Sequence, residues 1–155
     1  MLSATAEYAL RAVVFLMDHR GTPHTADAIS SVTKVPVGYL SKILQGLAKA
    51  GIISSQRGPS GGFTLGTDQE ALTVLDVLRV VDPLRRIEAC PLELAGHGTR
   101  LCPLHRLLDS TTALVEKRFA DVTIASLLGQ RRGSHPLCEF PRHGEPDPAL
   151  AVRRG

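Results

Sequence analysis

Residues 57–65 read RGPSGGFTL, a segment of one charged residue, three glycines and one proline that ends in the apolar Leu65. Residues 52–55 before it and 63–65 at its end have the composition of short strands. The glycine-rich segment is therefore predicted to join two strands as a hairpin. Its tip, RGPSGG, has little to bury, so we expect it to extend away from the core.

A helix precedes this hairpin. Pro36 suits a first helical turn and Gly51 is a stop signal. Between them, apolar residues recur on one helical face: Leu40, Ile43, Leu44 and Leu47. A shorter helix over 26–32, with Thr25 as its N-cap, and a turn at 33–34 come before it.

The order helix, turn, helix and hairpin predicts a winged helix-turn-helix, with RGPSGG as the tip of the wing. The fold class is mainly α with a small two-stranded β wing, completed by a helix over 3–19 that Gly21 and Pro23 end. In such a fold the second helix enters a DNA groove and the wing lies on the backbone or in a minor groove. Glycine is useful there because it lets backbones approach closely.

The second half of the chain is predicted to hold two further helices. Thr73 and Asp76 have capping-box spacing at the start of a helix over 73–81. Residues 84–101 are expected to be irregular, and a long helix follows from Pro103 to about Arg118. Its apolar stripe needs a partner, and a second copy of the chain is the obvious one: Leu104, Leu107, Leu108, Thr111, Leu114 and Val115.

These elements suggest four parts. They are a winged helix-turn-helix domain over 1–82, a loop over 83–102, a dimerisation region over 103–128 and a disordered tail over 129–155. The chain has no apolar run long enough to cross a bilayer and does not open on a secretory signal, so we expect a cytoplasmic protein. Three cysteines, an odd number, argue against a disulfide framework.

Charge is distributed unevenly along the chain. The net charge is only +3, yet no acidic residue lies between Asp27 and Asp68. The window contains four basic residues and no acidic residue between them: Lys34, Lys42, Lys49 and Arg57. A surface without carboxylates suits a phosphate backbone, although chance clustering is the alternative.

Polar residues on the outer face of the second helix, and on the hairpin, are the candidates for DNA contact. Gln can read adenine edges, Ser and Tyr can bind phosphate or base edges, and basic groups neutralise phosphate. Gly38 and Lys49 flank this face. The predicted DNA-contacting residues are Tyr39, Ser41, Lys42, Gln45, Arg57, Pro59 and Ser60. An ordinary solvated helix face is the alternative interpretation.

A second constellation holds Cys90, His97, Cys102 and His105 within sixteen residues. Thiols and imidazoles suit zinc or an iron–sulfur cluster, but the spacing is not that of a zinc finger. Cys102 precedes Pro103 and is a candidate N-cap, where the helix dipole favours thiolate. Buried structural cysteines and solvated histidines are the alternative. Cys138, between His135 and His143, is expected to be incidental.

Four segments together resemble the winged-helix, iron–sulfur-sensing repressors of the IscR/NsrR family. They are EYALRAVVFL at 7–16, VPVGYLSKILQGLAKAGIISSQRGPSGGF at 35–63, LTVLDVLRVVD at 72–82 and the cysteine loop at 90–105. The resemblance covers about residues 1–128. It implies a homodimer that binds palindromic promoter DNA, with crossed long helices and a cluster in the loop before each of them.

The resemblance also implies a ligand set. Family members commonly have three cysteines in the loop; Cys90 and Cys102 match the outer two, and the middle one is replaced locally by Gly96 and His97. In some members a His three residues after the last Cys is a ligand, which is His105 here. In others an acidic residue of the second subunit completes the site, and Glu7 stands at that position. Two thiolates with His97, His105 or Glu7 favour [2Fe–2S] over [4Fe–4S], and fewer thiolates also leave room for a protein without a cluster or one that binds zinc or haem.

The function that follows is a dimeric DNA-binding transcription regulator, a repressor, that senses redox state, nitric oxide or iron through a [2Fe–2S] cluster. One alternative is a winged-helix repressor without a cluster, responding to zinc, haem or another small effector. A module that docks a protein partner is another. An enzyme is not expected, because Cys102 and His105, one helical turn apart, make a poor nucleophile–base pair.

Overall fold

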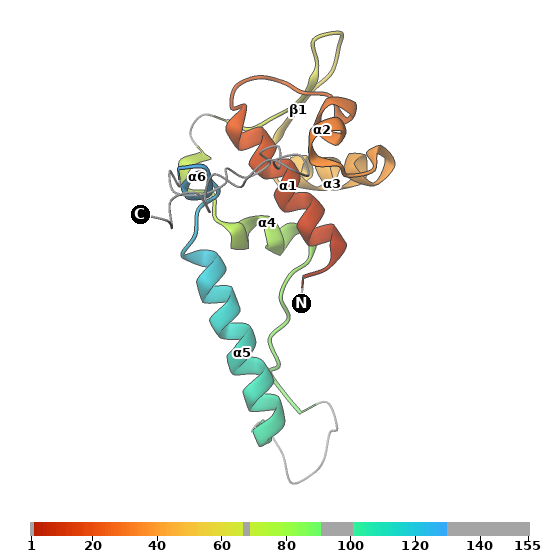
Figure 1. The fold of residues 1–155 in the computed structure, drawn as a ribbon. Coiled ribbons are helices and arrows are strands. Elements are labelled where there is room, and N and C mark those ends of the chain that lie inside the picture. Colours follow the sequence, from red (N-terminus) through yellow and green to blue (C-terminus); the bar gives the residue numbers. More distant parts are fainter. Residues whose placement is uncertain (1, 67–68, 91–100, 130–155) are drawn as a thin grey trace, which may run out of the picture.

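The computed structural model describes residues 2–66, 69–90 and 101–129. Its elements divide between a cluster of short helices with a hairpin and one long helix that extends away from them (Figure 1). In chain order they are α1 (Ala4–Asp18), α2 (Ala26–Thr33), α3 (Val37–Lys49), β1 (Ser54–Gln56), β2 (Gly62–Thr64), η1 (Gln69–Ala71), α4 (Val74–Val81), α5 (Pro103–Ala120) and α6 (Ile124–Leu128). The expected fold class, mainly helical with a two-stranded wing, is confirmed.

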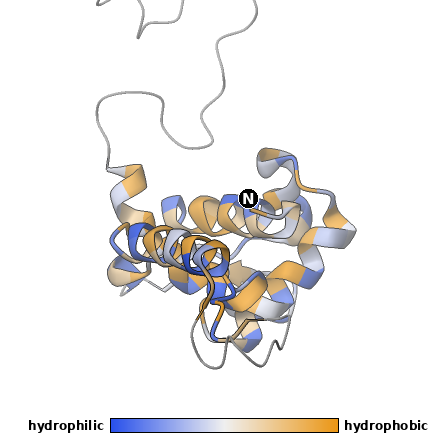
Figure 2. Ribbon diagram, turned by 90° about the horizontal axis from the view of Figure 1, so that it is seen from below, coloured by the Kyte–Doolittle hydropathy of each residue, from blue (hydrophilic) through white to orange (hydrophobic). Residues whose placement is uncertain are grey.

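Helix α1 is the centre of the core and packs against α2, α3, α4 and α6. Ala6, Ala9 and Ala12 are fully buried along it, and their small side chains let the neighbouring helices approach closely. Helix α3 places its predicted apolar face inward, with Leu40 and Leu47 both at 0% exposure. Helices α1 to α4 and the wing therefore share one apolar core. Figure 2 shows how apolar and polar residues alternate along the helices.

The helix ends follow the local signals in the sequence. The side-chain oxygens of Thr25 and Thr73 accept hydrogen bonds from the backbone N–H groups of Ala28 and Asp76. The Asp76 carboxylate in turn accepts from the backbone N–H of Thr73, which completes a capping box. Cys102 occupies the N-cap position of α5, although its side chain makes no capping bond. Pro36 is the N-cap of α3, one residue before the first helical turn where it was expected.

The wing differs from the prediction in its boundaries. Strand β1 begins at Ser54 rather than at residue 52, and β2 spans 62–64 rather than 63–65. Ile52 and Ile53 lie in the core instead, at 9% and 3% exposure, because burying two large apolar side chains outweighs two more ladder positions. The strands pair antiparallel with Ser55 opposite Phe63.

Beyond α4 the chain runs alongside α5. The Arg86 guanidinium binds the Asp109 carboxylate through Nε and Nη2, both at 2.7 Å, and the backbone N–H of Ile87 donates to the same carboxylate at 2.9 Å. Arg86 also lies 3.5 Å from Glu116. These contacts attach the irregular segment after α4 to the middle of α5.

Helix α6 was not predicted from the sequence. It turns back from α5 onto α1 and buries Ile124 completely. Thr123 caps it and pairs through a β-bridge with Thr73, so the chain after the long helix rejoins the winged unit. The tail expected to be disordered was 129–155; Gly129 is the C-cap of α6, and residues 130–155 lie outside the described residues.

Candidate nucleic-acid interface and cysteine–histidine site

The outer face of α3 carries the side chains that were predicted to meet DNA. Lys42, Gln45 and Lys49 are exposed, while Ser41 is half-buried with its hydroxyl donating to the carbonyl of Val37 at 3.0 Å. The helix thus separates an apolar inner face from a polar and basic outer one. This is the arrangement that a recognition helix requires.

A groove of about 530 Å³ separates α3 from the wing. Gln45 and Lys49 line it from the helix, and Arg57 lines it from the hairpin. Its complete lining contains no acidic residue: Gln45, Ala48, Lys49, Ser55, Gln56, Arg57, Gly62 and Phe63. Two predicted contact residues that are twelve positions apart in sequence, Gln45 and Arg57, therefore share one surface feature.

The basic side chains of this region are not neutralised within the chain. Among the described residues, Lys42, Lys49 and Arg57 form no ion pair. Lys34 donates through Nζ to the carbonyl of Ser31, at 2.6 Å. Since none of these cations has a carboxylate partner in the described chain, their charge remains available to phosphates.

Tyr39 is exposed but fixed in place. Its hydroxyl lies 2.7 Å from the hydroxyl of Thr5 on α1, and its ring meets Tyr8 edge to face at 5.8 Å between centroids. The sequence spacing of α3 could not reveal this link, because Thr5 is 34 residues away. Pro59 and Ser60 are exposed at the tip of the wing, as predicted.

The glycines of the wing have an internal role that the sequence reasoning missed. Gly62 has φ +154°, and a Cβ there would lie 2.6 Å from the carbonyl oxygen of His24. A Cβ on Gly61 would lie 2.4 Å from the carbonyl oxygen of Gln56. Glycine at these positions allows the hairpin to close and to pair with His24, whose N–H and C=O both bond Phe63. The close approach of Gly61 to Gln56 and of Gly62 to His24 therefore requires glycine at both positions, independently of any contact between the wing and DNA.

Two sulfurs meet one imidazole at the start of α5. The Nδ1 of His105 lies 3.1 Å from the Sγ of Cys102 and 3.8 Å from the Sγ of Cys90. Cys90 is buried at 6% exposure and Cys102 is half-buried. Two thiols and one imidazole, from the end of the 82–90 segment and the start of α5, thus lie close together.

The remaining predicted ligands are not part of this cluster in the described chain. His97 lies outside the described residues. Glu7 is exposed on α1 and forms an ion pair with Arg11 one turn later. Within the described ranges, no group of three His, Cys, Asp or Glu side chains has the geometry of a metal centre. Thiolate and imidazole are donor types that iron–sulfur and zinc sites use, but the described residues alone do not assemble such a site.

The chain matches, over residues 2–130, the family described as Rrf2, iron-dependent transcriptional regulator. It belongs to the Rrf2 family. It is therefore a DNA-binding transcriptional regulator and not an enzyme. In the described part of the chain, no helix is long and apolar enough to cross a membrane.

Relatives and solved structures agree with this assignment. A protein named as an HTH-type transcriptional regulator of Mycobacterium tuberculosis H37Rv is 33% identical over 153 residues, covering 92% of this chain and 95% of its own. Another from Aquifex aeolicus is 27% identical over 131 residues, covering 83% and 91%. Both relatives are thus named as HTH-type transcriptional regulators, and the first of the two matches covers nearly the whole chain.

Two solved Rrf2 structures share the fold. CymR, the global cysteine regulator of B. subtilis, has a TM-score of 0.64 at 25% identity and covers 81% of this chain and 96% of its own. IscR of T. potens has a TM-score of 0.68 at 22% identity, with coverages of 83% and 86%. The resemblance to IscR-type regulators is thus confirmed for family and fold.

Proposed function

We propose that this Rrf2 regulator is a homodimeric repressor of palindromic promoter sites and that an iron–sulfur cluster at the start of α5 tunes its grip on DNA. The observation that carries the proposal is the convergence of Cys90, Cys102 and His105 at the N-terminus of the helix suited to dimerise. The parts are those expected from the sequence: a DNA-binding domain over 1–82, a cluster loop over 83–102 and a dimerisation region over 103–128.

DNA binding uses the groove between α3 and the wing. Gln45 reads a base edge in the major groove, while Arg57 and the neighbouring Pro59 and Ser60 lie on the backbone beside it. Ser41, Lys42 and Tyr39 extend the contact along α3. The absence of acidic residues from the groove lining supports this assignment.

Dimerisation uses the apolar face of α5. Four leucines of that helix are large, apolar and mostly exposed: Leu104 at 60%, Leu107 at 63%, Leu108 at 47% and Leu114 at 70%. A row of this kind along one long helix is a typical interface between two copies. Two copies of α3 held at a fixed separation would then match two half-sites.

The cluster is assigned to Cys90, Cys102 and His105, with His97 or Glu7 of the partner subunit as the fourth ligand. Two thiolates with nitrogen or carboxylate ligands favour [2Fe–2S] over [4Fe–4S]. Such a centre supplies a site that responds to oxidants, nitric oxide and iron supply. The chain's own contribution is the link from Arg86 and Ile87 to Asp109, through which a shift of the loop moves α5.

A DNA-binding assay tests the interface. Fluorescence anisotropy with a fragment of the protein's own promoter should show specific binding. Arg57→Ala should weaken binding to all sequences and reduce the slope of log K against log salt by about 1 for each lost phosphate contact. Gln45→Ala should also relax sequence preference. Lys117→Ala, on α5 and paired with Asp121, is the matched control. Unchanged affinity in both interface variants would show that the recognition surface is elsewhere.

Anaerobic purification tests the cluster. The native protein should be coloured and contain iron and acid-labile sulfide, and Cys102→Ala should lose both. Cys138→Ala, which removes the cysteine assigned no role, should keep them. A colourless protein without iron rejects the cluster. A winged-helix repressor that responds to zinc, haem or another small effector is then the remaining interpretation.

A further inference from the structure

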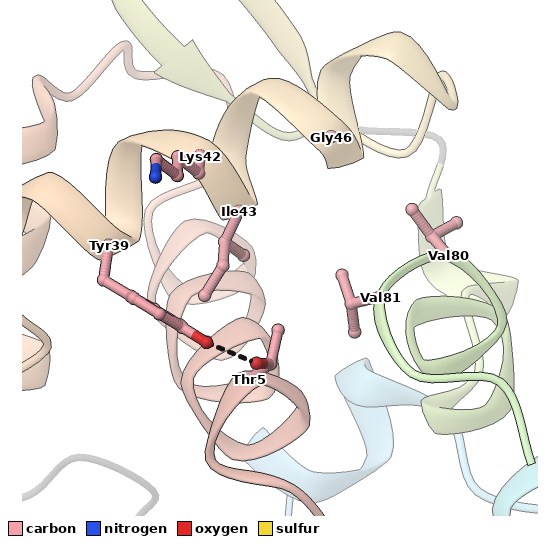
Figure 3. A pocket seen from close by; sticks show the side chains of 7 residues that line it. All are labelled: Thr5, Tyr39, Lys42, Ile43, Gly46, Val80 and Val81. Atoms are coloured by element: carbon pink, nitrogen blue, oxygen red, sulfur yellow. Dashed lines mark hydrogen bonds between the residues drawn. The ribbon is translucent and has the colours of Figure 1, made fainter.

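A second groove lies on the opposite flank of α3, away from the wing. It encloses about 280 Å³ between three helices (Figure 3). Thr5 comes from α1, Val80 and Val81 come from α4, and the other residues of the lining come from α3: Tyr39, Lys42, Ile43 and Gly46. The groove shares Ile43 with the core, and none of its lining residues belongs to the α3–wing groove.

The walls are apolar and the ends are polar. Ile43 and Val81 project toward the space between α3 and α4, and Val80 is 37% exposed beside them (Figure 3). The paired hydroxyls of Tyr39 and Thr5 close one end of the groove. Lys42 contributes to the lining and forms no ion pair among the described residues.

Gly46 leaves the backbone of α3 open to this groove. A Cβ at this position would meet no atom within 4 Å, so no neighbour in the described chain requires a glycine. Glycine in a helix interior costs stability relative to alanine. Its presence at an open position on the lining is consistent with an occupant that lies directly against the helix backbone.

We propose that this groove binds a small apolar carboxylate. The volume, just under the range of about 300–1,000 Å³ of most small-molecule sites, admits a small ligand only. Its hydrocarbon part packs between Ile43 and Val81, and its carboxylate pairs with Lys42 and accepts a hydrogen bond at the hydroxyl end. Mostly apolar walls with a few placed polar groups are the usual composition of such a site.

Occupation of the groove would also act on DNA binding. This consequence rests on the proposed function, in which Lys42 neutralises a phosphate. A carboxylate bound beside Lys42 cancels that charge and places a negative group next to the recognition helix, which lowers DNA affinity. The ligand would therefore release the protein from its operator, independently of the cysteine–histidine site.

Calorimetric titration of the native protein with octanoate tests the site without DNA. We expect saturable binding, one octanoate per chain, with methyl NMR shifts at Val80 and Val81. Gly46→Leu fills the groove and should weaken binding by about tenfold or more, a loss near 1.4 kcal/mol. Gly38→Leu is the matched control, because it lies on the same helix, also meets nothing within 4 Å and does not line the groove; it should bind within about twofold of the native protein.

The charge is tested separately. Lys42→Gln should weaken octanoate binding roughly two- to fivefold, as expected for an exposed ion pair, and octan-1-ol should bind less well than octanoate to the native protein. If the titration shows no saturable heat, the proposal is wrong. This includes the case in which the second subunit already fills the groove. The proposal is also wrong if Gly46→Leu and Gly38→Leu bind octanoate equally well, or if the native protein binds octan-1-ol as well as octanoate.

A DNA arm separates this proposal from the proposed function. Octanoate should lower the affinity of the native protein for its promoter fragment but not that of Gly46→Leu. If the native protein binds octanoate and no DNA, the proposed function fails and the groove stands. If it binds DNA and no octanoate, the groove fails and the proposed function stands.

Discussion

Replacing Gly62 by alanine tests how the wing is held to the rest of the protein. The added Cβ would lie 2.6 Å from the carbonyl oxygen of His24 and 2.7 Å from its carbonyl carbon. Both are backbone atoms, so no side-chain rotation relieves the overlap. Strand β2 must therefore move away from His24, and the residue must also keep φ near +154°, which alanine disfavours.

The cost follows from what the movement breaks. His24 and Phe63 exchange two backbone hydrogen bonds, at 2.9 Å and 2.8 Å. Each contributes about 0.5–1.5 kcal/mol net, and a strained backbone adds about 1–3 kcal/mol. We expect Gly62→Ala to lower the free energy of unfolding by roughly 2–6 kcal/mol. With a slope near 2 kcal/mol per M, the urea midpoint falls by about 1–3 M.

Urea denaturation followed by circular dichroism measures this change. Gly46→Ala is the matched control, because its Cβ meets nothing within 4 Å in a helix interior. It should raise the free energy of unfolding by about 0.5–1 kcal/mol. If Gly62→Ala unfolds within about 0.5 kcal/mol of the native protein, the pairing with His24 is not what requires glycine, and our account of the wing is wrong.

Three further changes have expected outcomes. The Arg86 hydrogen bonds, and then the Ile87 N–H, lower the pKa of Asp109 to about 2, so stability from this carboxylate is present above about pH 4 and is lost as pH falls through 2. Asp109→Asn should reduce that loss in acid melting curves; an unchanged acid profile would contradict the link. Burial, followed by the charge of His19, lowers the pKa of His24 below 6.5, so stability should fall as the pH drops below 6.5. Urea titrations at pH 5.5 and 7.5 should show a smaller difference for His24→Phe, and an equal difference refutes this assignment. Leu107→Glu should convert the proposed dimer to monomer in sedimentation, and a persistent dimer would move the interface off this face of α5.

Local patterns were enough to predict most of the helices. The period of the apolar residues defines the buried face of α3, and Thr25 and Thr73 mark helix starts because their side chains bond backbone groups only three residues away. The same local reasoning identified the hairpin and the polar face of α3 opposite the core. It also identified Cys102 and His105 as neighbours, because side chains three residues apart in the first turn of a helix lie side by side.

Tertiary packing decided the rest. Strand β1 starts late because Ile52 and Ile53 are drawn into a core whose other walls come from distant segments. Position 62 requires glycine because it lies against the backbone of His24, which is 38 positions earlier in the chain. The Tyr39 hydroxyl is held by Thr5, which is 34 positions earlier.

By itself, the sequence determined where α1 to α5 lie, roughly where they begin and which of their faces are apolar, since those properties depend on interactions within a few residues. Only the tertiary structure decided the register of the wing, the return of α6 onto α1 and the groove beside Lys42. Those features arise from contacts between segments far apart in the chain, whose burial and backbone geometry no local pattern encodes.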